Sequence, residues 1–359
     1  MAAPTEPADE ADRLEGTPHP RHASILVGHA QAEQDLLEAY RANRLPHAII
    51  LGGPPGIGKA TLAWRLARFI LAHPDPTSAT VRGARDLSAS DETRVAAQIA
   101  SLSHPDVSLL RREINEKTKR FYTEIRADDV RRTIQLFQRA AGAGGYRICL
   151  VDSAEDLNRS SANALLKLIE EPPPASLFLL VAHRPGLILP TIRSRARFMR
   201  LQSLTAPEIE TVIASLGAPW RDESPANIAK AAAQARGSVH GALRLINAQG
   251  LELDALVQRL LQRLPTVDWR EVHRLADQIG GRDGEAGFEI AMTAIHDWID
   301  DCVQRGATSQ NAARLVPYAE AWEKVTANAR ETDALNLDKR PLLLTIFSDL
   351  AAAVQAAQV

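Results

Sequence analysis

Between residues 25 and 202 the chain alternates short apolar runs with longer stretches in which apolar residues recur at helical spacing. Short runs dominated by apolar residues are typical of strands buried on both faces. The runs are Ile49–Leu51, Val107–Leu110, Tyr146–Val151 and Leu177–Ala182. Strands that alternate with helices in this way predict a parallel sheet covered by helices, which is an α/β fold.

The stretches between these runs carry helix signals of their own. Residues 125–140 place Asp128 and Asp129 in a first helical turn, where the helix dipole favours acidic side chains. Residues 158–170 form another helical pattern, and the prolines at 172–174 should end it, because proline lacks a backbone donor and clashes with the preceding turn.

From residue 203 onward the pattern is almost entirely helical. Thr205 is the expected N-cap of the first helix, and breaks are expected at Gly280, Gly306 and Pro317. We therefore predict four segments: a disordered lead, an α/β domain, a small helical domain and a larger helical domain. Their ranges are 1–21, 22–202, 203–260 and 261–359.

Composition narrows the class of protein. With 359 residues, 45% hydrophobic and 24% charged, the chain can build two or three ordinary globular domains. Its net charge of -2 provides no overall basic field, so any contact with nucleic acid should be local or shared with partners. No signal pattern and no long apolar run suggests membrane insertion. Cys149 and Cys302 fit a reducing compartment. We expect a soluble cytoplasmic protein.

A phosphate-binding loop is predicted directly after the first apolar run. Gly53, Gly56, Gly58 and Lys59 fit the first seven positions of G-x-x-x-x-G-K-[ST], in which backbone N–H groups cradle phosphates and the lysine reaches the outer phosphates. The eighth position is Ala60, where a hydroxyl should hold Mg²⁺. Thr61 lies one residue further, roughly 100° around the helix, so it should face away from the phosphates.

A second nucleotide signal lies at the end of the third apolar run. Asp152 follows this strand directly. An aspartate in that place, downstream of a phosphate loop, helps to hold Mg²⁺. We predict that Asp152 and Lys59 face the same site.

Five segments resemble the clamp-loader branch of the AAA+ ATPases and together span residues 45–195. They are Leu45–Lys59, His104–Asp106, Leu150–Leu157, Ala162–Pro173 and Thr191–Arg195. The run from Asn163 through Lys167 to Glu170, Glu171 and the prolines is far more specific than a phosphate loop alone.

The resemblance implies roles for the chain's parts. Residues 203–260 would be the helical lid of an AAA+ core, and residues 261–359 the collar through which clamp-loader subunits form a ring. Val27 and Gly28 would lie against the adenine of ATP or ADP. In this family a Ser-Arg-Cys motif supplies an arginine finger to the ATP site of a neighbouring subunit. Here the motif is Ser194-Arg195-Ala196, which keeps the arginine.

Departures from the family pattern fall on the chain's own ATP site. Ala60 lacks the Mg²⁺ hydroxyl, and Ser153 stands where the family's catalytic glutamate follows the strand aspartate. The sensor positions fall on Ala182 or His183 and on His240. No cysteine lies between Lys59 and Cys149, so the zinc module of many relatives is not expected.

The resulting hypothesis is a stator subunit without intrinsic catalysis. Its own site is impaired, whether it binds ATP or ADP is left open, and Arg195 serves a neighbour. The implied partners are the clamp loader's motor subunits and clamp-opening subunit, and through the complex the sliding clamp and primed DNA. Two alternatives stay open at this stage: an active AAA+ clamp-loader ATPase, and a P-loop enzyme of the kinase type.

Overall fold

The computed structural model describes residues 14, 16–117, 120–138, 145–247, 250–280, 284–307, 312–335 and 337–358. They fall into two compact units that divide between Gly241 and Ala242. The first unit contains the sheet and the second is helical. Each unit is described by itself.

Within the described residues, the main sheet of the first unit has five strands in the order β2-β5-β6-β1-β7. Every neighbouring pair runs parallel. The strands are β1 (Ala48–Gly52), β2 (Val107–Leu110), β5 (Arg147–Val151), β6 (Ser176–Ala182) and β7 (Arg197–Arg200). The parallel α/β fold predicted from the apolar runs is confirmed, and the runs correspond to β1, β2, β5 and β6. The edge strand β7 was not predicted.

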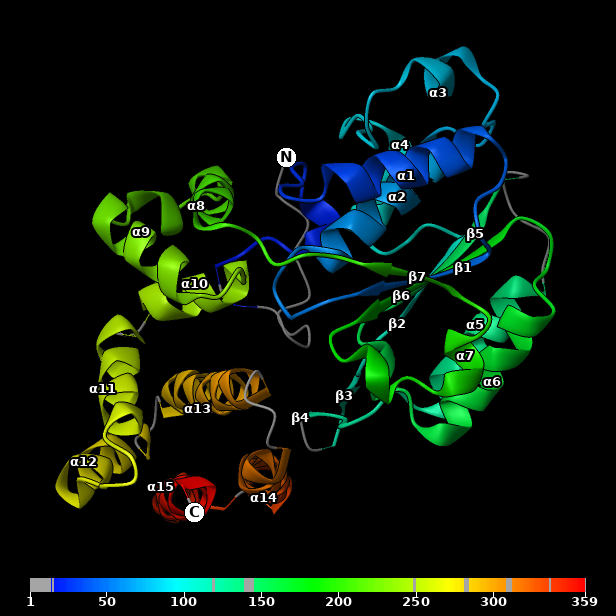
Figure 1. Ribbon diagram of the computed structural model, residues 1–359. Helices are drawn as coiled ribbons and strands as arrows, with labels where there is room; N and C mark the ends of the chain where they lie inside the picture. Colours follow the sequence, from blue (N-terminus) through cyan, green and yellow to red (C-terminus); the bar gives the residue numbers. More distant parts are fainter. Residues whose placement is uncertain are drawn as a thin grey trace. The chain divides into compact units, whose positions relative to one another are not determined.

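Helices cover both faces of this sheet (Figure 1), which explains why its central strands are buried at every residue. One face packs against α1 (Ala30–Arg41), α2 (Lys59–Ala72), α3 (Ala79–Gly83) and α4 (Arg94–Ala100). The other face packs against α5 (Ala127–Phe137), α6 (Arg159–Glu170) and α7 (Pro190–Arg193). Along β1, Ile49 belongs to the first core and Ile50 to the second, as the alternation of strand side chains requires.

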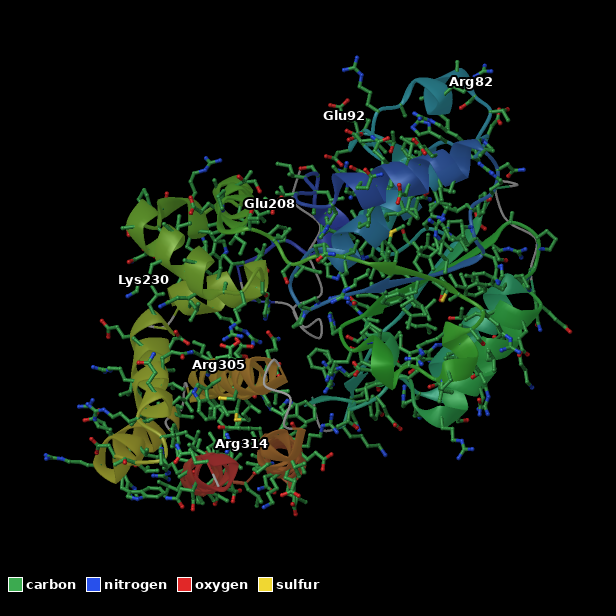
Figure 2. The ribbon with its side chains drawn as sticks, viewed as in Figure 1. Arg82, Glu92, Glu208, Lys230, Arg305 and Arg314 are labelled. Atoms are coloured by element: carbon green, nitrogen blue, oxygen red, sulfur yellow. The ribbon has the colours of Figure 1, made fainter. Side chains whose placement is uncertain are left out.

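Local signals set the helix ends. Asn158 caps α6 by accepting a hydrogen bond from Ser161 N at 2.8 Å, and the helix ends at Glu170 before the prolines. Thr205 and Glu208 form a capping box at the start of α8 (Ala206–Ser215), where Figure 2 labels Glu208. The predicted N-cap at Thr205 is confirmed.

The polar segment between α2 and β2 is tied down by a buried ion pair. Arg65 of α2 donates to Glu33 Oε1 of α1 from Nε at 3.0 Å and from Nη2 at 2.8 Å. The same oxygen accepts from Leu87 N at 3.2 Å. Glu33 and Arg65 are both buried, so one carboxylate joins two helices to the loop that carries Leu87.

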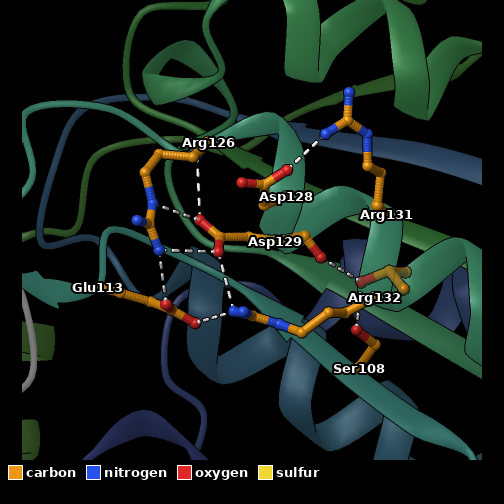
Figure 3. A network of polar contacts seen from close by, with 8 residues as sticks. Ser108, Glu113, Arg126, Asp128, Asp129, Arg131 and Arg132 are labelled. Atoms are coloured by element: carbon orange, nitrogen blue, oxygen red, sulfur yellow. Dashed lines mark hydrogen bonds and ion pairs between the residues drawn. The ribbon is translucent and has the colours of Figure 1, made fainter.

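A short hairpin follows β2, with β3 (Ile114–Asn115) antiparallel to β4 (Arg120–Phe121). Glu113, just before it, pairs with Arg126 at 3.2 Å and with Arg132 at 2.5 Å, and both arginines also pair with Asp129 of α5 (Figure 3). The acidic residues therefore balance much of the positive charge around the hairpin.

The lead predicted for residues 1–21 lies mostly outside the described residues. Its last part is folded onto the first unit: Pro20–His22 form a short 3₁₀ helix, and Trp220 Nε1 donates to Gly16 O at 2.9 Å. Arg21 is buried and donates from Nε to Ala100 O at 2.9 Å. Tertiary contacts thus hold residues before 22, in a segment whose composition alone gives no structural signal.

The rest of the first unit is helical and includes α8, α9 (Pro225–Gln234) and the start of α10 (Val239–Ile246). The second unit contains the remaining helices. These are α11 (Gly250–Gln262), α12 (Trp269–Ile279), α13 (Gly284–Ala307), α14 (Val316–Leu335) and α15 (Lys339–Gln358).

The three expected helix breaks agree with the second unit to within one residue. Gly280 caps the end of α12, and Pro317 lies in the first turn of α14, where proline is tolerated. The break expected at Gly306 falls one residue before the end of α13 at Ala307. Among the described residues, α15 is the one helix long and apolar enough to cross a membrane, and 44% of its apolar window is buried inside the protein.

Candidate functional site

The predicted phosphate-binding loop, residues 53–59, lies between β1 and α2, at the carboxyl edge of the parallel sheet. Gly56 and Gly58 have positive φ angles of 73° and 98°, which residues with a Cβ rarely adopt. Gly56 also has no room for a side chain, because a Cβ there would lie 2.3 Å from Ser238 Oγ. The backbone therefore explains these two glycines of the predicted motif.

Lys59, the first residue of α2, points back into its own loop. Its side chain is buried, and Nζ donates to Gly53 O at 2.7 Å and also to Pro54 O. Burial lowers the pKa of Lys59 to about 8, while Glu155 and Asp152 act against this shift. The ammonium is thus held by loop carbonyls, and the charges of the two acidic side chains favour its protonated form.

The negative charge of Asp152 acts on the pKa of Lys59, although less than that of Glu155. That Asp152 and Lys59 share one nucleotide site stays a prediction. Asp152 leaves β5, and its N–H donates to Leu110 O at 2.8 Å. The next residue, Ser153, is buried and has a φ of 66°. A serine hydroxyl cannot replace a carboxylate as the base that activates water.

Glu155 is engaged elsewhere. Its Oε1 accepts hydrogen bonds from His183 N at 2.8 Å and Arg184 N at 2.9 Å. This carboxylate fixes the chain just after β6, at the position expected for the first sensor. Ala182, the last residue of β6, is fully buried.

Ala60 and Thr61 follow Lys59 in the first turn of α2. Ala60 packs against the core between the sheet and helices α1 to α4. It offers no oxygen to a metal ion. Among the described residues, no group of three or more His, Cys, Asp and Glu side chains could hold a metal ion.

A segment near the start of α10 lies directly on the loop. Val239 N donates to Gly56 O at 2.9 Å, and His240 N would lie 3.1 Å from a Cβ on Gly56. The preceding glycine, Gly237, accepts from Leu204 N at 3.1 Å. The predicted second-sensor position, His240, is therefore beside the loop.

Val27 and Gly28 precede α1 on another side of the loop. Gly28 has a φ of 83°, and a Cβ there would clash with Leu204. The next residue, His29, is buried and its Nε2 lies 2.6 Å from Ile57 O. Sequence reasoning missed His29 and Val239, since neither belongs to a motif and both act through contacts between distant segments.

Arg195 lies just beyond α7, and its side chain is 42% exposed. Its Nη2 pairs with Glu170 Oε1 at 2.9 Å, and its Nη1 donates to Thr191 O and Ser194 Oγ, each at 3.1 Å. These contacts are with α6, α7 and the turn after it. The loop at 53–59 is not among them, so Arg195 forms a separate surface feature.

We compared the sequence with known protein families and proteins. Residues 28–205 match the profile of a family described as DNA polymerase III, delta subunit. The chain is 38% identical over 149 residues to the DNA polymerase III subunit delta' of Pseudomonas aeruginosa, covering 42% of this chain and 41% of that protein. The chain is therefore similar to the delta-prime subunits of DNA polymerase III. Its clamp-loader resemblance in sequence is thereby confirmed.

Other relatives extend the match. The delta-prime subunit of Escherichia coli is 29% identical over 237 residues, which cover 66% of this chain and 65% of the relative. The matches thus span between about two fifths and two thirds of these delta-prime relatives. A solved gamma subunit-related protein of DNA polymerase III from Thermotoga maritima covers 89% of this chain and 99% of its own, with 14% identity and a TM-score of 0.37.

Proposed function

We propose that this chain is a stator subunit of the DNA polymerase III clamp loader. It would stand beside the motor subunits and the clamp-opening subunit and help to load the sliding clamp onto primed DNA in chromosomal replication. The match of residues 28–205 to a DNA polymerase III subunit family, together with the similarity to two delta-prime subunits, carries this proposal. Such a protein would work in the cytoplasm, at the nucleoid during replication.

The geometry of the loop supports an impaired ATP site. The ammonium of Lys59 donates to the carbonyls of Gly53 and Pro54. The phosphates of any bound ATP or ADP would have to compete with these carbonyls for the ammonium. Ala60 supplies no Mg²⁺ ligand, and the nearby carboxylate of Glu155 already accepts two backbone N–H groups.

Arg195 supports the second half of the proposal. A finger that acts on a neighbour must lie on an exposed surface, away from its own loop, and Arg195 meets both conditions. We propose that its guanidinium stabilises the charge that develops on a neighbour's ATP during hydrolysis.

The remaining assignments belong to the same proposal. Residues 203–260 would act as the lid, residues 261–359 as the collar, and Val27 and Gly28 would border the adenine of any bound nucleotide. The charge of Asp152, which acts on the pKa of Lys59, favours a second candidate, an active clamp-loader ATPase. No described contact favours a kinase-type enzyme.

The test is ATP turnover by the reconstituted clamp loader with Arg195→Ala. Loss of a finger should lower turnover at the site that receives it by about a thousandfold or more, and DNA- and clamp-stimulated hydrolysis by the complex should fall accordingly. Arg197→Ala is the matched control, since Arg197 is also exposed and lies two residues away. Equal activity of the Arg195→Ala and control complexes would refute the finger.

A further inference from the structure

Arg195 is folded back onto its own subunit. Its Nη1 donates to the backbone of Thr191, four residues earlier, and to the hydroxyl of Ser194, while Nη2 meets the carboxylate of Glu170. Of these three acceptors, Glu170 alone is charged. A guanidinium held in this way is turned toward its own α6 and α7.

Glu170 occupies an unusual position for an acidic residue. It is the last residue of α6, where the exposed carbonyls and the negative end of the helix dipole disfavour a carboxylate. Its described cationic partner is Arg195, with 2.9 Å between Oε1 and Nη2. The carboxylate therefore gains its compensation from this arginine.

The ion pair between Arg195 and Glu170 is also weak enough for another anion to replace Glu170. The side chains of Arg195 and Glu170 are 42% and 39% exposed, and ion pairs with this much solvent contact are weak. Carboxylates and phosphates present similar oxygen acceptors to a guanidinium. A phosphate brought to this surface carries more charge than one carboxylate and should displace it.

We propose that Glu170 is the resting occupant of the anion site of Arg195, and that a phosphate on a neighbouring subunit's nucleotide takes its place on assembly. This inference rests on the proposed finger function. It assigns to Glu170 the control of how readily the finger engages. In the free subunit the carboxylate holds the guanidinium against its own subunit. In the assembled complex the nucleotide must compete with that carboxylate for the guanidinium.

The experiment uses the reconstituted clamp loader with Glu170→Gln. This change keeps the shape of the side chain and removes its charge. Glu171→Gln is the matched control, because Glu171 is the next residue and is also exposed. ATP turnover is measured against the concentration of the variant subunit, at low and at high salt.

The Glu170→Gln complex should reach half of its maximal turnover at about a two- to five-fold lower subunit concentration, the range expected for loss of one exposed ion pair. The effect should shrink at high salt, because salt screens the competing charge. Glu171→Gln should behave as the wild type. A merely structural role for Glu170 would not produce a salt-dependent gain.

The outcomes separate the two proposals. If Arg195→Ala leaves the turnover of the complex intact, the finger function fails and this inference fails with it. If Arg195→Ala lowers turnover while Glu170→Gln leaves the half-maximal concentration unchanged or raises it, the finger stands and the competing role of Glu170 is overturned. Thermal melting of each variant shows that the subunits compared are folded.

Discussion

At the residue scale, the contacts of Lys59 bear on whether the loop at 53–59 can bind nucleotide phosphates. In a working phosphate loop this lysine reaches the outer phosphates. Here its ammonium donates to Gly53 O and Pro54 O within the same loop. Burial of the charge is unfavourable, and it lowers the lysine's pKa to about 8.

This pKa predicts a pH dependence of stability. Because the folded-state pKa of Lys59 lies below its ordinary value, the unfolded chain binds more protons between about pH 8 and pH 10.5, and stability should rise with pH there. Relative to Lys59→Met, the wild type should gain about 1 to 2 kcal/mol in free energy of unfolding between pH 8 and 9.5.

Urea unfolding of both proteins at the two pH values measures this difference. Other titrating groups, such as the buried thiol of Cys149, are present in both proteins, so their contributions cancel. A constant difference between wild type and Lys59→Met would show that the ammonium is not held in a buried position.

Residue patterns predicted part of this site. The loop glycines, Lys59 and Asp152 follow from spacing along the chain, and the charge of Asp152 acts on the pKa of Lys59. The contact of Val239 with Gly56 could not be predicted, since it joins segments far apart in sequence. The same is true of Glu155, whose role depends on where β6 ends.

At the element scale, burial decides what the sequence reveals. The strands β1, β5 and β6 are covered on both faces, so they appear as apolar runs. The edge strand β7 carries Arg197 and Arg200 and is mostly exposed, and such a strand leaves no apolar run. Gly306 lies one residue before the end of α13, where a glycine costs the helix little.

The segment between α2 and β2 depends on polar contacts. Replacing Arg65 with Met should leave Glu33 buried without its charged partner and lower the free energy of unfolding by about 3 to 5 kcal/mol. Proteolysis within residues 73–105 should become faster at the same time. Urea unfolding and limited proteolysis measure the two effects.

Asp128→Asn is the control for this prediction. Asp128 pairs with Arg131 at 2.5 Å, and the two side chains are 70% and 67% exposed, so its loss should cost at most about 1 kcal/mol. Equal losses for Arg65→Met and Asp128→Asn would contradict the view that the buried carboxylate holds the segment.

At the scale of the whole molecule, the first unit carries two features that should contribute differently to ATP turnover by a clamp loader. In the loop at 53–59, the ammonium of Lys59 is held by the loop's own carbonyls. Arg195 is exposed and is held by one weak ion pair and two hydrogen bonds. The stator account therefore places this subunit's contribution to ATP turnover at Arg195 and assigns none to Lys59.

The most direct test compares ATP turnover by the isolated chain with turnover by the reconstituted complex carrying either Lys59→Ala or Arg195→Ala. The account predicts no turnover by the isolated chain, near-normal turnover by the Lys59→Ala complex and a large loss in the Arg195→Ala complex. Robust turnover by the isolated chain that disappears with Lys59→Ala would contradict it and identify an active ATPase.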